Sequence, residues 1–129
     1  RRIRGCLDSP VAREVRVLRQ QLDGVEHILA GETALARYTT LAEPPEQTLA
    51  VSPGTWRKLR RDTEAIPVPD DTTCILQLWR YDPGILQTDG VADPYSLWLS
   101  MKNTADERLQ IALDQLLDKD EGWTLSKLD

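Results

Sequence analysis

Apolar positions recur at helical spacing near both ends of the chain. Near the amino-terminal end, the residues at this spacing are Val11, Val15, Leu18 and Leu22. They predict an amphipathic helix over residues 10–22 that ends before Gly24. Toward the other end, the pattern predicts a short helix from Pro94 and a second helix over 105–118. The apolar stripe of this second helix consists of Leu109, Ala112, Leu113, Leu116 and Leu117.

The segments between these helices carry strand patterns. Residues 25–30 alternate between apolar and polar, and residues 47–52 form a second short apolar run. Residues 72–81 combine β-branched and aromatic side chains and give the clearest strand signal in the chain. Residues 65–69 are predicted to be a further short extended piece.

Three helix starts have the same form, in which a residue with a capping oxygen precedes a proline. These pairs are Ser9-Pro10, Ser52-Pro53 and Asp93-Pro94. With helices also predicted over 32–41 and 53–63, the order of elements is α-β-α-β-α-β-β-α-α. This order predicts an α+β (mixed α/β) fold in a single domain over residues 1–129, with a small mixed sheet and helices packed against it.

Composition agrees with a globular domain. Of the 129 residues, 40% are hydrophobic and 29% are charged, which is typical of a folded chain. No apolar run approaches the roughly 20 residues of a membrane span, and the start of the chain has no signal-peptide pattern. We therefore expect a cytoplasmic protein with no membrane partner.

Charge is distributed unevenly along the chain, although the net charge is −5. Arginines are concentrated before residue 20, a second basic segment covers 57–61, and the last third is acidic. The candidate residues for nucleic-acid binding are Arg13, Arg16, Arg57, Lys58, Arg60 and Arg61. The alternative for any one of them is a solvated basic face.

A turn of small and polar residues raises the question of nucleotide chemistry. Gly31, Glu32 and Thr33 are candidate nucleotide-binding residues, because a Gly-Ser/Thr turn can hold phosphates. A nucleotidyltransferase also needs metal-binding carboxylates on a neighbouring strand, and the strand over 47–52 has none. We therefore predict no catalytic residue, no metal site and no cofactor. Glu32 is then a charge that favours a helix N-terminus.

The remaining chemical candidates are isolated residues. His27 is the only histidine, and its position on a predicted strand favours a structural role. Cys6 and Cys74 lack the close spacing of a zinc site. Both a disulfide and two free thiols stay open, with free thiols favoured. Arg108 is predicted to pair with Asp93, Asp106 or a carbonyl.

The order of three stretches resembles the effector domain of AbiEi-type antitoxins, the regulators of bacterial type IV toxin–antitoxin (abortive infection) pairs. The stretches are LAGETALARYTTLAEPPEQTLAVS, IPVPDDTTCILQLWRYD and DPYSLWLSMKNTADERLQIALDQLLD. Together they span about residues 25–118. The resemblance implies a degenerate nucleotidyltransferase-like domain that counteracts a cognate nucleotidyltransferase toxin. It also implies an upstream winged helix-turn-helix that binds operator DNA, with residues 1–8 as the candidate tail of that part.

Three functions stay open at this point. The first is a non-catalytic domain of an antitoxin-like transcriptional regulator. The second is a nucleotide-binding or nucleotidyltransferase-like enzyme that uses the turn at Gly31. The third is a protein–protein oligomerisation module, with a homo-oligomer as one form, that uses the exposed side of the helix over 105–118.

Overall fold

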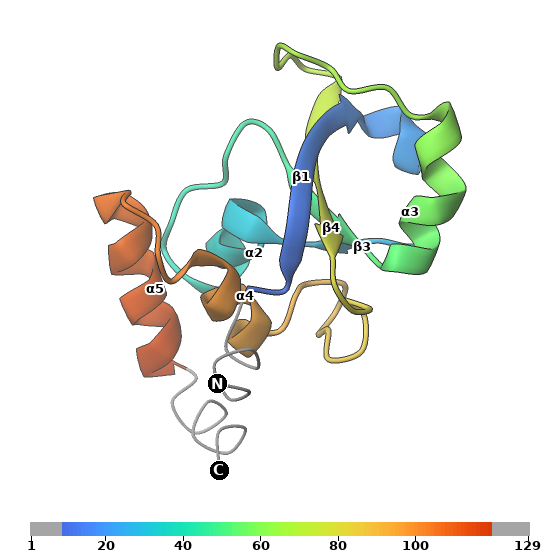
Figure 1. The fold of residues 1–129 in the computed structure, drawn as a ribbon. Helices are drawn as coiled ribbons and strands as arrows, with labels where there is room; N and C mark the ends of the chain where they lie inside the picture. Colours follow the sequence, from blue (N-terminus) through green and yellow to red (C-terminus); the bar gives the residue numbers. More distant parts are fainter. Residues whose placement is uncertain (1–8, 120–129) are drawn as a thin grey trace.

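The computed structural model describes residues 9–119, which form a mixed four-stranded sheet with helices on both faces (Figure 1). The strands are β1 (Val11–Leu18), β2 (Ile28–Leu29), β3 (Thr48–Val51) and β4 (Thr73–Trp79). The α-helices of this part are α2 (Gly31–Tyr38), α3 (Pro53–Leu59), α4 (Pro94–Met101) and α5 (Glu107–Lys119). Two 3-10 turns are η1 (Arg19–Leu22) and η2 (Arg60–Asp62). The predicted α+β architecture is confirmed.

The strand order in the sheet is β1-β4-β3-β2. The central strands β3 and β4 run parallel, and α3 lies in the connection between them. The outer strands β1 and β2 pair antiparallel with β4 and β3 respectively. The carboxyl ends of β3 and β4 therefore meet at the same edge of the sheet.

Each face of the sheet has its own hydrophobic core. The three-helix core lies under α2, α4 and α5 and contains Leu35, Trp79, Leu97, Leu113 and Leu116, among others. The α3-side core contains Val17, Leu22, Leu49, Val51, Cys74, Leu76 and Leu78, with Trp56 and Leu59 of α3 packed against it. Figure 1 shows the three helices on one side of the sheet and α3 on the other. Both faces are covered, so β3 and β4 are buried nearly throughout and consist mostly of apolar residues.

The predicted helix over 10–22 is wrong, because this segment forms β1 followed by η1. Val15 and Val17 lie opposite Leu76 and Cys74 of β4 and point toward the α3-side core. Their spacing of two is the strand period, and valine is favoured in strands. The cross-strand pairing with β4 therefore outweighs the coincidental helical spacing. Residues 1–8 and Cys6 lie outside the described residues.

Two predicted strands are shorter than expected or do not form. The strand over 25–30 is reduced to β2, which has two residues. The extended piece over 65–69 joins no strand, although the Ile66 amide donates a hydrogen bond to the Arg16 carbonyl in β1 (2.8 Å). Pro67 and Pro69 have no N–H to donate, which prevents continued pairing.

Two of the three proline-marked helix starts are confirmed. The Ser52 hydroxyl accepts a hydrogen bond from the Thr55 amide (3.1 Å) at the start of α3, and the Asp93 carboxylate accepts one from the Ser96 amide (2.9 Å) at α4. At Ser9 the hydroxyl accepts from the Val11 amide (3.1 Å), but a strand follows. In the described part of the chain, no helix is long and apolar enough to cross a membrane.

Candidate functional site

The glycine turn connects β2 to α2 against the backbone of β3. Gly31 has φ +54°, in the left-handed region that favours glycine. A Cβ added at this position would lie 2.8 Å from Cγ2 and 3.1 Å from Cβ of Thr48. The turn is therefore packed directly on β3, and glycine is required here for both conformation and space.

The two residues after Gly31 also make contacts within the fold. Thr33 is fully buried, and its hydroxyl oxygen accepts a hydrogen bond from the Thr48 amide (2.9 Å). Glu32 accepts a hydrogen bond from the Arg108 guanidinium at the start of α5 (2.8 Å). The three candidate nucleotide-binding residues thus fasten α2 to β3 and α5.

Arg108 also pairs with Asp106 (3.3 Å), one of its predicted partners. The contact with Glu32 was not predicted from the sequence, because the two residues are far apart along the chain. Opposite charges at these two positions were the signal that could have suggested it. These contacts raise the pKa of Arg108, chiefly through the hydrogen bond to Glu32.

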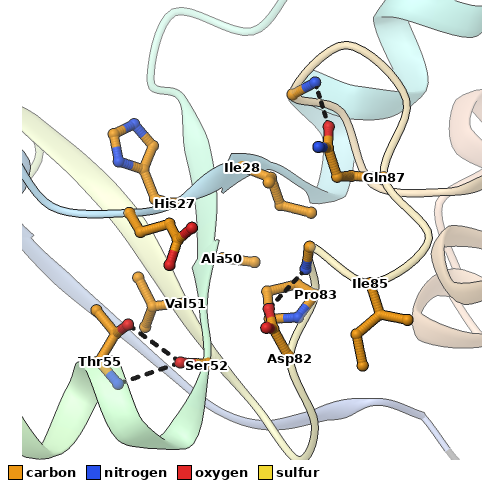
Figure 2. Close-up of a pocket in the computed structure, with 13 residues that line it drawn as sticks. His27, Ile28, Ala50, Val51, Ser52, Thr55, Asp82, Pro83, Ile85 and Gln87 are labelled. Carbon is orange, nitrogen blue, oxygen red and sulfur yellow. Dashed lines mark hydrogen bonds between the residues drawn. The ribbon is translucent and has the colours of Figure 1, made fainter.

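A pocket lies at the edge of the sheet where β3 and β4 end (Figure 2). Its volume is about 290 Å³. Figure 2 shows His27 on one side and Asp82 with Pro83 on the other, and Ala50 and Val51 of β3 lie between them. Ligands of open α/β sheets commonly bind beyond the carboxyl ends of the strands, which makes this pocket a candidate site for a small ligand.

Several polar groups around this pocket are bonded to nearby backbone. The Asp82 carboxylate accepts a hydrogen bond from the Gly84 amide (2.8 Å), and the Gln87 side-chain oxygen accepts one from the Gly90 amide (2.6 Å). Nδ1 of His27 lies 2.7 Å from the Val25 carbonyl oxygen, which it can contact only as a donor. His27 is exposed and follows the turn before β2, rather than alternating within a strand as predicted.

A metal site or a reactive thiol among the described residues would be a further source of chemistry. Among the described residues, no three His, Cys, Asp or Glu side chains gather in a way that could hold a metal ion. Cys74 is a free thiol, fully buried in the α3-side core, and burial raises its pKa to about 11. A protonated, inaccessible thiol is a packing group and not a nucleophile.

The predicted nucleic-acid-binding residues divide between the two faces of the sheet. Arg16 lies opposite Ile75 and makes two hydrogen bonds to the Glu46 carboxylate (2.7 and 3.2 Å). Arg13 lies opposite Leu78, which belongs to the α3-side core. Arg13 therefore projects on the α3 side of the sheet, and Arg16 projects on the opposite side. The other four candidates, Arg57, Lys58, Arg60 and Arg61, are exposed on α3 and η2, on the same side as Arg13.

The ion pair at Arg16 is a structural link between β1 and the connector before β3. The hydrogen bond from Arg16 lowers the pKa of Glu46, and a further hydrogen bond from the Thr73 hydroxyl (2.7 Å) lowers it too, against an opposing effect of burial. Arg16 is therefore already engaged within the fold.

Searches of protein-family models, curated proteins and solved structures find no match to this chain.

Proposed function

We propose that this chain is a non-catalytic domain of a bacterial antitoxin-like transcriptional regulator. It counteracts a nucleotidyltransferase toxin and supports operator binding by the regulator. The proposal begins from the resemblance of residues 25–118 to AbiEi-type antitoxin domains. The observation that carries it further is the state of the glycine turn.

In a working phosphate-binding turn, backbone amides and a hydroxyl face the ligand. Here the Thr33 hydroxyl is buried and accepts a hydrogen bond from the Thr48 amide. Gly31 itself is packed against the Thr48 side chain. The strand that follows places Thr48 and Ala50 on the α2 side, where a transferase would carry metal-binding carboxylates. These contacts favour a turn that has been kept as scaffold.

A binding measurement separates this proposal from the enzyme alternative. Calorimetric titration of the chain with each nucleoside triphosphate, in the presence of Mg²⁺ or Mn²⁺, is expected to give no heat of binding up to millimolar concentration. Saturable binding that is lost in a Glu32→Gln variant would instead support a nucleotide site at the turn.

Counteraction of a toxin is tested in growing cells. The proposal predicts that a nucleotidyltransferase is encoded beside the gene of this chain, and the two proteins are co-expressed under separate inducers. Growth is expected to recover when the chain is induced. A Leu35→Asp variant serves as the negative control, because a charge at this fully buried position disrupts the core. Continued arrest with the folded wild-type chain would overturn the proposal.

A further inference from the structure

Four cations form a compact group on the outer side of α3 and η2, which we call the basic ridge: Arg57, Lys58, Arg60 and Arg61. All four are exposed. Trp56 and Leu59, which precede and separate them in the sequence, pack toward the α3-side core. Because residues three and four apart lie on one side of a helix, the inward packing of these two residues leaves Arg57, Lys58 and Arg61 on the solvent side. Arg60, which follows α3 in η2, is exposed as well.

The basic ridge differs from the three arginines of the described residues that form ion pairs. Arg16 pairs with Glu46, Arg37 pairs with Glu43, and Arg108 pairs with both Glu32 and Asp106. Within residues 9–119, the side chains of the basic ridge make no ion pair. One acidic residue, Asp62, follows directly in η2 and is also exposed. The four cations outweigh it, so the local charge is positive in a chain whose net charge is −5.

We propose that the basic ridge docks on the phosphate backbone of duplex DNA and does so without reading base sequence. This inference rests on the proposed function and names the partner of this surface. Arginine presents a planar fork of donors that matches phosphate oxygens, and lysine adds a point charge. Such contacts position a protein on DNA but carry no sequence information directly.

The surroundings of the basic ridge favour a nucleic acid over a protein or a membrane. Protein interfaces depend on buried aromatic and apolar anchors, and surface membrane binding requires an apolar face that enters the lipid. The large apolar residues exposed in the described chain lie elsewhere: Val68, Tyr81, Ile85, Leu86 and Ile111. Within α3 and η2 the exposed side chains are the four cations and Asp62, and such a surface suits a highly charged polyanion.

The size of the basic ridge sets the expected salt dependence. Residues 57–61 cover about 6 Å along a helix axis, which matches a few phosphates of a duplex. Two to four phosphate contacts give a slope of log K against log [NaCl] between about −2 and −4. Four contacts correspond to a loss of about a hundredfold in affinity between 50 and 200 mM NaCl.

The test measures binding of the 129-residue chain to a fluorescent duplex of arbitrary sequence by anisotropy, over a series of NaCl concentrations. The R57Q/K58Q/R60Q/R61Q variant is expected to lose at least tenfold in affinity at low salt, with a slope close to zero. R60Q alone is expected to make the slope shallower by about 1. The matched control is R37Q, which removes an exposed arginine on α2 and is expected to bind like wild type.

Each outcome decides the inference. Unchanged binding by the four-site variant, or an equal loss in R37Q, would overturn it. Preference for one duplex sequence over another of the same length would also overturn it. Displacement of the DNA by polyglutamate at equal charge would assign the surface to an acidic protein instead. The urea midpoint of each variant is measured first, and it should match wild type because the substituted residues are exposed.

The growth assay keeps the two proposals separate. If the four-site variant still rescues growth but no longer binds DNA, the basic ridge is confirmed as a surface distinct from toxin counteraction. If the wild-type chain binds DNA through the basic ridge but does not rescue growth, the proposed function fails while the DNA contact stands.

Discussion

Substitution of Gly31 by alanine should be one of the most damaging small changes in the molecule. Gly31 has φ +54°, and a non-glycine residue in the left-handed region costs about 1–2 kcal/mol. The added Cβ would lie 2.8 Å from Cγ2 of Thr48, on a buried strand. Overpacking of this kind costs about 1–3 kcal/mol. Together these terms predict a loss of about 2–5 kcal/mol in the free energy of unfolding.

Gly24 provides the matched control for Gly31→Ala. It has φ +74°, also in the left-handed region, but a Cβ added there meets no atom within 4 Å. Gly24→Ala should therefore show the conformational cost alone, about 1–2 kcal/mol. The difference between the two variants isolates the contact with Thr48.

Urea unfolding followed by tryptophan fluorescence measures both variants. With a slope of about 2 kcal/mol per M, the midpoint of Gly31→Ala should fall by about 1–2.5 M. Adding Thr48→Ser removes the nearest methyl group and should restore part of this loss. Equal losses in the two glycine variants, or no recovery with Thr48→Ser, would refute the packing argument.

Three further predictions concern single contacts. Thr33→Val should cost about 1–3 kcal/mol in urea unfolding, because the buried Thr48 amide loses its acceptor; an unchanged midpoint would show that the amide finds another partner. The pKa of Glu46 is lowered in the folded state, chiefly by the Arg16 hydrogen bond, so its stabilising effect is present above its unfolded pKa of about 4.3 and is lost as the pH falls through the folded pKa. Melting temperatures measured between pH 6 and pH 2 should therefore fall less steeply for Glu46→Gln than for wild type, and parallel curves would contradict this. Cys74 is fully buried, with its pKa raised to about 11, so in a variant lacking the other cysteine a thiol reagent at pH 8 should react only after denaturation; rapid reaction of the native protein would show that the core opens.

The central part of the fold could be predicted from the sequence because local and tertiary signals agree there. β4 combines β-branched and aromatic residues and is covered on both faces, so its apolar run identifies it directly. The starts of α3 and α4 are marked by a capping side chain followed by proline. At such positions the backbone preference and the packing select the same structure.

Elements that depend on distant partners could not be identified in this way. β1 is a strand because β4 pairs with it, and its valines satisfy a helical and a strand pattern at once. Arg16 is already paired with Glu46, which lies thirty positions away in the sequence, and no local pattern predicts this pairing. The burial of Thr33 likewise depends on how closely α2 approaches β3, which no local pattern specifies.

The position of β1 at the edge of the sheet has a consequence for the way the chain is synthesised. Its partner is β4, which begins at Thr73, so β1 is synthesised first of the four described strands but is paired only when the last of them has been made. At about 5–20 residues per second, Val11–Leu18 waits several seconds with its backbone unpaired. During that interval the nascent chain presents a valine-rich edge that a chaperone can cover until β4 emerges.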